Sequence, residues 1–132
     1  MAGIQGNIAM DKLRVLVVDD KKVIGDLFDF TLGYSGHQIT VVDNAMDALN
    51  AIRKQEFDVA FLDIVMPGKD GVEVLQDIRG ISPKLPIIMM SGYSVEDKRL
   101  QATALGAVTC LKKPFEMEDV KKAIKAAIGR EI

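Results

Sequence analysis

The chain has 132 residues, of which 48% are hydrophobic and 27% charged, with a formal net charge of −2. These values are typical of one soluble globular domain, and they give no overall basic field for nucleic acid. The single cysteine excludes an internal disulfide, and no apolar run reaches the roughly 20 residues of a membrane span. Without a secretory signal, we expect a cytoplasmic protein with a flexible tail at residues 1–11 and one domain at residues 12–132.

Strands and helices alternate along the predicted domain. Short β-branched or apolar runs predict five strands, and apolar residues spaced as on one helix face predict five helices. The strands are expected at 13–18, 38–42, 57–62, 87–90 and 108–111, and the helices at 21–32, 45–54, 72–79, 95–105 and 116–128. Strict alternation predicts an α/β fold with a parallel sheet, right-handed crossovers and helices on both faces.

Polar and charged side chains follow four of the five predicted strands. In chain order they are Asp19, Asp20, Asp63, Ser91 and Lys113. The carboxyl ends of parallel strands emerge at one edge of the sheet, which is where open α/β sheets place ligands. The second strand ends on Val42 and Asp43 and contributes no evident member to this set.

The three carboxylates crowd together if the first and third strands are neighbours. Like charges about 4 Å apart repel by roughly 4 kcal/mol at an effective dielectric near 20, so a cation has to compensate. Mg²⁺ suits oxygen ligands, Lys113 suits phosphate oxygens, and the Ser91 hydroxyl can donate a hydrogen bond. A nucleophilic carboxylate, a divalent ion and such donors are the parts that phosphoryl transfer needs. At this point a simple loop-capping role for Asp63 remains the alternative.

Four motifs carry a resemblance to a known family. They are Leu16-Val17-Val18-Asp19-Asp20, Leu62-Asp63-Ile64-Val65-Met66-Pro67-Gly68-Lys69-Asp70-Gly71, Ser91-Gly92 and Lys113-Pro114-Phe115. As an ordered set they resemble the receiver domain of bacterial two-component response regulators, over roughly residues 12–128. The resemblance implies a flavodoxin-like, doubly wound (βα)5 fold with strand order 2-1-3-4-5.

The resemblance also implies roles for the polar residues. Asp63 would be the phosphoacceptor, Ser91 the hydroxyl that moves to the phosphoryl group, and Lys113, rather than Lys112, the lysine of the site. The peptide bond between Lys113 and Pro114 would be cis.

The metal ligands are implied in the same way. Mg²⁺ would be held directly by Asp20, Asp63 and the backbone carbonyl of Val65. Asp19 would act mostly through water.

Position 110 departs from the family pattern. The family usually carries Tyr or Phe three residues before the lysine, and that ring turns inward when the Ser or Thr moves. Here the residue is Cys110, which we expect to be a buried core cysteine. How phosphorylation reaches the surface of the fourth helix, fifth strand and fifth helix is therefore open, although Ser91 and the loop at residues 92–96 could retain some coupling.

Other side chains bear on the lifetime of the phosphoryl group and on docking. In the family, the side chains two positions past the residues that match Asp63 and Ser91 govern water access to the phosphoryl group. Here they are Val65 and Tyr93, with no carboxamide or acid to orient water, so the resemblance implies slow self-dephosphorylation. On the first helix, Phe30, with Val23 and Ile24, could form an exposed apolar patch for a partner. Scattered surface hydrophobic residues are the equal alternative.

The resemblance implies a phosphorylation switch. A sensor histidine kinase or histidine phosphotransfer protein would supply the phosphoryl group, and a downstream protein would read the change in affinity. We expect a single-domain regulator, monomeric or weakly dimeric, because the chain starts at Met1 and no output domain follows Ile132. A fragment of a larger regulator or hybrid kinase is the alternative. No basic recognition helix or membrane segment indicates direct binding to DNA or a membrane.

Two other classes of protein need residues that the chain lacks. A haloacid-dehalogenase-type phosphatase also uses a nucleophilic Asp, but it needs a second acid where Val65 stands. A flavodoxin-like cofactor binder needs a glycine-rich phosphate loop after the first strand, where Asp19 and Asp20 would repel phosphate. We therefore expect no enzymatic activity beyond slow self-dephosphorylation.

Overall fold

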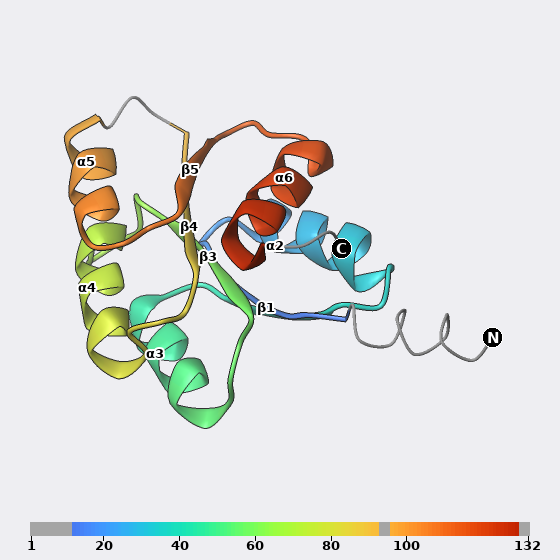
Figure 1. The fold of residues 1–132 in the computed structure, drawn as a ribbon, viewed down its shortest axis with the longest axis horizontal. Helices are drawn as coiled ribbons and strands as arrows, with labels where there is room; N and C mark the ends of the chain where they lie inside the picture. Colours follow the sequence, from blue (N-terminus) through green and yellow to red (C-terminus); the bar gives the residue numbers. More distant parts are fainter. Residues whose placement is uncertain (1–11, 93–95, 130–132) are drawn as a thin grey trace.

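The computed structural model describes residues 12–92 and 96–129, so the expected tail at residues 1–11 lies outside the described part. Five parallel strands form one sheet in the order β2-β1-β3-β4-β5, with helices on both faces (Figure 1). The predicted flavodoxin-like fold and its strand order are thus confirmed. None of the described helices is long and apolar enough to cross a membrane.

The strands and helices follow the predicted alternation. The strands are β1 (Arg14–Val18), β2 (Gln38–Val42), β3 (Val59–Asp63), β4 (Ile87–Ser91) and β5 (Thr109–Lys112). The helices are α2 (Lys22–Phe28), α3 (Ala45–Lys54), α4 (Gly71–Ile81), α5 (Glu96–Ala104) and α6 (Met117–Ile128). Most predicted boundaries lie close to these, but the first expected helix continues past α2 as a π-helical segment, η1 (Asp29–Gly33).

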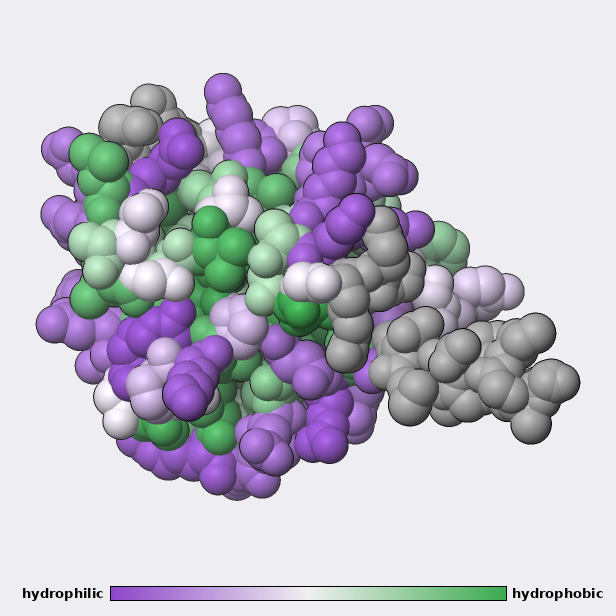
Figure 2. Space-filling view, viewed as in Figure 1, coloured by the Kyte–Doolittle hydropathy of each residue, from purple (hydrophilic) through white to green (hydrophobic). Residues whose placement is uncertain are grey.

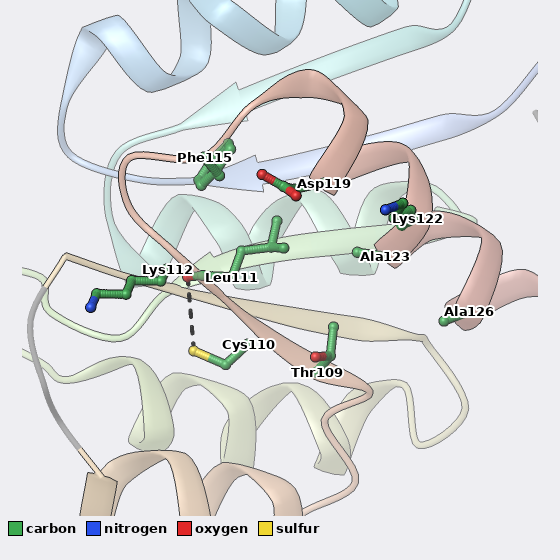
Figure 3. A pocket seen from close by; sticks show the side chains of 9 residues that line it. All are labelled: Thr109, Cys110, Leu111, Lys112, Phe115, Asp119, Lys122, Ala123 and Ala126. Atoms are coloured by element: carbon green, nitrogen blue, oxygen red, sulfur yellow. Dashed lines mark hydrogen bonds between the residues drawn. The ribbon is translucent and has the colours of Figure 1, made fainter.

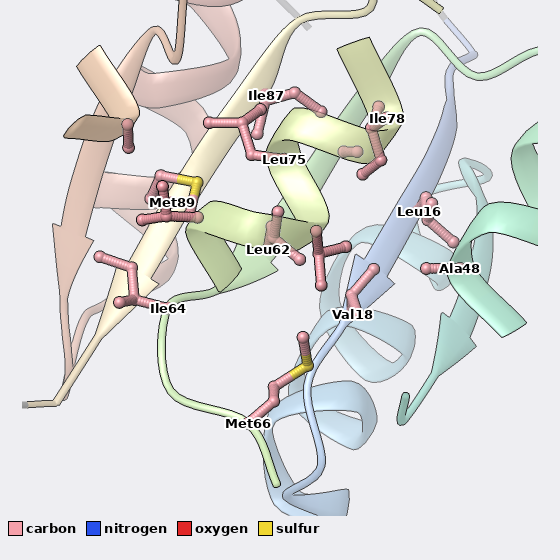
Figure 4. Close-up of a cluster of buried hydrophobic side chains, with 14 of the residues drawn as sticks. Leu16, Val18, Ala48, Leu62, Ile64, Met66, Leu75, Ile78, Ile87 and Met89 are labelled. Carbon is pink, nitrogen blue, oxygen red and sulfur yellow. The ribbon is translucent and has the colours of Figure 1, made fainter. Parts of the chain in front are cut away.

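The central strands are buried because helices cover them on both sides. Every residue of β3 and β4 is buried, whereas the edge strand β2 is only partly covered. Successive side chains of a strand alternate between two cores. Leu16, Val18 and Leu62 pack with α3, α4 and α5 (Figure 4), and Val17 and Phe61 pack on the other side with α2 and α6. Figure 2 shows hydrophilic side chains around the rim of the molecule and more hydrophobic ones near the centre of that view.

Local hydrogen bonds fix where α3 and α4 begin. The Asn44 side chain accepts from the Asp47 N–H at 2.8 Å, and the Asp70 side chain accepts from the N–H groups of Val72 and Glu73 at 2.8 and 3.0 Å. Such caps satisfy amide donors that have no partner within the helix. The start of α4 is therefore held by a residue of the loop that leaves β3.

Gly71 lets α4 begin directly against the end of β3. A Cβ atom at this position would lie 2.2 Å from the Asp63 carbonyl oxygen and 2.7 Å from the Ile64 Cα. The Gly71 N–H donates to the Ile64 carbonyl at 2.7 Å, which closes the intervening loop on itself. The backbone of Asp63 is thus clamped between its strand and the following helix.

Candidate functional site

Three carboxylates meet at the carboxyl edge of the sheet. β1 pairs with β3, with Val18 beside Leu62, so the residues that follow these two positions emerge together. One carboxylate oxygen from each of Asp19, Asp20 and Asp63 lies within 4.8 Å of the other two. The acids that the sequence placed on separate strands therefore form one cluster, and Asp43, at the end of β2, is not part of it.

The three acids differ in burial. Asp19 and Asp63 are each only 2% exposed, whereas Asp20 is exposed to solvent. Asp19 accepts a hydrogen bond from the Lys21 N–H at 2.8 Å, and the Lys21 ammonium lies 3.6 Å from Asp20. Asp20 consequently offers an accessible carboxylate at the mouth of a cluster whose other two members lie deeper.

Lys113 supplies the cation inside the cluster. Its Nζ lies 2.6 Å from Asp19 Oδ2 and 3.2 Å from Asp63 Oδ2. The backbone places it there, because the Lys113 N–H donates to the Ser91 carbonyl at 2.7 Å and the peptide bond to Pro114 is cis, as predicted. Lys112, by contrast, lines a groove between β5 and α6 (Figure 3). Lys113 is therefore the lysine that reaches the acids.

Each oxygen of Asp63 has a partner. Oδ1 accepts from the Val65 N–H at 3.1 Å, and Oδ2 accepts from Lys113. Burial raises the pKa of Asp63 and the nearby Asp19 charge adds to this rise; the Val65 N–H and Lys113 lower it, but the pKa stays above its ordinary value. An added cation at the cluster would favour the ionised, nucleophilic form.

The pKa of Lys113 is also raised, but here burial opposes the rise and the neighbouring charges cause it. Burial lowers the pKa of its ammonium, but the carboxylates of Asp19 and Asp63 raise it, and the pKa ends above its ordinary value. Lys113 is therefore a permanent positive charge at neutral pH.

Ser91 lies beside the acids at the end of β4. It is 2% exposed, and the residue before it, Met90, pairs with Asp63 across the sheet. Val65, two residues past Asp63, is exposed, while Tyr93 lies outside the described residues. Ser91 thus follows the sheet partner of Asp63 on the neighbouring strand, and Val65 presents an exposed apolar side chain close to Asp63 in the chain.

Cys110 is partly rather than fully buried, which corrects the expected buried core cysteine. It pairs with Met89 in the sheet and packs against the core formed with α3, α4 and α5. Figure 3 shows its sulfur on the opposite side of β5 from the Leu111 side chain. It is less covered because β5 is the edge strand.

The apolar patch predicted on the first helix is smaller than expected. Phe30 is 78% exposed and Val23 is also exposed, but Ile24 is partly buried and packs against the core beneath α2 and α6. The patch on this helix is therefore formed by Val23 and Phe30 without Ile24.

One ion pair at the site was not found from the sequence. The Lys98 ammonium on α5 lies 2.6 Å from Oδ2 of Asp70, the residue that caps α4. Burial would raise the pKa of Asp70, but Lys98 and the capping N–H groups lower it below its ordinary value. Both residues are common surface types in separate loops and helices, so the pattern gave no signal for their contact.

Comparison with known proteins gives a consistent match. A family model described as the response regulator receiver domain matches residues 15–125. NtrX from Brucella abortus is 32% identical with a TM-score of 0.83, over 89% of this chain and 28% of that one. A CheY-like receiver domain protein from Methanospirillum hungatei JF-1 is 27% identical with a TM-score of 0.85, over 90% and 95%. Chemotaxis protein CheY4 from Vibrio cholerae is 30% identical with a TM-score of 0.82, over 88% and 98%. The chain thus spans less than a third of NtrX and nearly the whole length of the other two.

Proposed function

Because the chain belongs to the response regulator receiver domain family, we propose that it is a phosphorylation switch with Asp63 as the phosphoacceptor. One observation carries this assignment: Asp63 is a buried carboxylate that shares the Lys113 ammonium with Asp19 at the carboxyl edge of the sheet. A sensor histidine kinase or a histidine phosphotransfer protein would be the phosphodonor.

The acid cluster fits Mg²⁺, since three carboxylate oxygens converge within 4.8 Å and hard divalent ions prefer oxygen ligands. Asp20, Asp63 and the backbone carbonyl of Val65 would hold the ion directly, and Asp19 mostly through water. This division agrees with the pairing of Asp19 with Lys113 and with the exposure of Asp20. When bound, the ion would offset negative charge on the phosphoryl oxygens.

The transfer itself uses groups of this chain. A carboxylate oxygen of Asp63 attacks phosphorus while the bond from phosphorus to the donor histidine breaks, and the imidazole nitrogen keeps the bonding electrons. Lys113 offsets the charge that gathers on the phosphoryl oxygens, and the Ser91 hydroxyl donates a hydrogen bond to one of them. The product carries about two negative charges on the phosphoryl group in place of the single charge of the Asp63 carboxylate, at a site that was already acidic.

Signalling would follow from altered binding to another protein, by a chain that acts as a monomer or weak dimer. The exposed Val23 on α2 and Phe30 on η1 offer apolar side chains for the phosphodonor. The exposed, apolar Val65 supports slow self-dephosphorylation. A single-domain regulator is the simplest form; a receiver within a longer regulator is the alternative, since NtrX extends well beyond the matched part.

The test is phosphorylation by acetyl phosphate with Mg²⁺, followed by intact-protein mass spectrometry. Wild type should gain one acid-labile phosphoryl group, and Asp63→Asn should gain none. Asp43→Asn, which changes an exposed acid at the end of β2, should label like wild type. Equal labelling of Asp63→Asn and wild type would remove Asp63 from the role.

A further inference from the structure

Helix α5 is attached to α4 differently at its two ends. After its carboxyl end, the Leu105 and Gly106 carbonyls accept hydrogen bonds from the Arg79 guanidinium of α4, at 2.9 and 3.1 Å. The same guanidinium donates to the Leu85 carbonyl at 2.7 Å. Near the amino end of α5, within the described residues, an ion pair joins Lys98 to Asp70, the residue that caps α4.

The two attachments differ in how readily they can be broken. The side chains of Lys98 and Asp70 are 41% and 30% exposed, and ion pairs with this exposure are weak and screened by salt. The Arg79 guanidinium is held by several backbone carbonyls at once, and these acceptors do not titrate. Helix α5 therefore has one fixed end and one end that can be released.

The amino end of α5 contacts the loop that follows Asp63. That loop leaves Asp63 at the end of β3 and finishes at Asp70. Oδ1 of Asp70 caps α4, Oδ2 meets Lys98, and the Gly71 N–H bonds back to the Ile64 carbonyl. A short, closed loop therefore connects Asp63 with the residue that contacts Lys98 of α5.

Phosphorylation has to disturb this loop or its neighbour. The two oxygens of Asp63 accept from the Val65 N–H and from Lys113, and the oxygen that bonds to phosphorus becomes a weaker acceptor. If Oδ1 reacts, the Val65 N–H of the loop loses its partner; if Oδ2 reacts, Lys113 must turn to the phosphoryl oxygens.

We propose that the Asp70–Lys98 ion pair couples Asp63 to α5, so that phosphorylation releases the amino end of α5 while Arg79 acts as its pivot. The proposal rests on the phosphoacceptor role of Asp63. It supplies a route to the surface in a chain where Cys110 cannot act as a rotating ring. By linkage, a partner that binds the released α5 favours the phosphorylated form.

The test is residue-resolved ¹⁵N–¹H NMR of the α5 backbone amides, with and without acetyl phosphate and Mg²⁺. In wild type, phosphorylation should shift the signals of residues 97–101 more than those of residues 104–106 near the pivot. Without phosphodonor, Lys98→Met should move the same signals along the same line toward their phosphorylated positions. The expected change is a rise of about 1.4- to fivefold in the ratio of released to attached α5, the range an exposed ion pair supplies.

Two further variants keep the test specific. Asp70→Asn removes the charge but keeps a residue that caps helices well, so it should behave like Lys98→Met. The matched control is Lys69→Met, which removes another part-exposed ion pair, with Asp77 of α4, and should leave the α5 signals in place.

Failure of this proposal can be told apart from failure of the phosphoacceptor role. If wild type gains a phosphoryl group and Lys98→Met leaves the α5 signals at their wild-type positions, the coupling is wrong and the phosphoacceptor role stands. An equal response to Lys69→Met would also overturn the coupling. If wild type gains no phosphoryl group, both proposals fall.

Discussion

Lys113 and Arg79 are both partly buried cations, at opposite edges of the sheet, but they contact different kinds of acceptor. Lys113 lies between two carboxylates at the carboxyl edge, and its side chain is 15% exposed. Arg79 lies near the amino edge and donates to backbone carbonyls of Leu85, Leu105 and Gly106.

The difference separates a site that can change state from one that cannot. Carboxylates accept protons, metal ions and covalent partners, so each contact of Lys113 can be replaced by another. The carbonyl groups that Arg79 contacts take up neither protons nor covalent partners, and its donors join α4, the segment after α5 and the loop before β4. The charge pairs of Lys113 therefore support the proposed functional role, whereas the backbone contacts of Arg79 are those of a structural link.

The largest expected effect is on the rate of phosphorylation, when Lys113 is replaced. Lys113→Met should slow phosphorylation by acetyl phosphate about a hundredfold, the usual cost of removing one group that stabilises developing charge. Mg²⁺ should still bind, because the carboxylates remain. Mass spectrometry over time gives the rate, and a rate equal to wild type would show that Lys113 has no part in transfer.

Removing the exposed acid should have the next largest effect. Asp20→Ala should weaken Mg²⁺ binding by at least about tenfold, since loss of even an outer-shell partner commonly costs this much. Isothermal titration calorimetry measures the affinity, with Asp43→Asn as the control. An unchanged affinity in Asp20→Ala would overturn the assignment of Asp20 as a direct ligand.

For Arg79, the comparison predicts that substitution lowers stability and leaves phosphorylation unchanged. Arg79→Met should lower the free energy of unfolding by about 1 to 2 kcal/mol, because the part-buried carbonyls of Leu85 and Leu105 lose donors. Phosphorylation by acetyl phosphate should proceed at the wild-type rate. Urea denaturation checks the first expectation, and Arg53→Met, at an exposed position of α3, is the control. A large loss of phosphorylation in the folded Arg79 variant would erase the distinction.

The smallest expected effect concerns pH. The raised pKa of Asp63 means that the folded protein binds its proton more tightly than the unfolded chain. Stability contributed by this group therefore falls as pH rises from about 3.9, the ordinary value, through the folded pKa. Asp63→Asn should be modestly more stable than wild type at neutral pH without metal, and the difference should vanish in acid. Thermal unfolding across pH measures both, and a variant less stable than wild type at neutral pH would contradict the sign.

The fold could be predicted well from the sequence because the central strands have a clear pattern. β3 and β4 are short apolar runs ended by turn residues, and each is buried throughout. The π-helical turn of η1 was not predicted, because the apolar spacing continues through it. The Thr31 hydroxyl donates to the Leu27 carbonyl at 2.6 Å there, a contact that the periodicity does not encode.

The candidate site could be located from the sequence, but not its internal geometry. Asp19 and Asp20 are identical neighbours, and only the direction of each side chain decides that Asp19 is buried against Lys113. The contact between Lys98 and Asp70 joins two elements far apart in the chain, so it depends on how α5 packs beside α4. These features are set by tertiary packing rather than by local pattern.

The contact between Gly71 and the backbone of Asp63 has a consequence for mutational tolerance. Any side chain at position 71 would collide with main-chain atoms, which cannot turn aside as a rotamer can. A library of all substitutions, sorted for folded protein, should therefore keep glycine alone at position 71. Gly80, where an added Cβ would meet nothing within 4 Å, should accept many residues. The backbone position of the proposed phosphoacceptor therefore depends on a second residue besides Asp63 itself, the glycine that packs against its carbonyl.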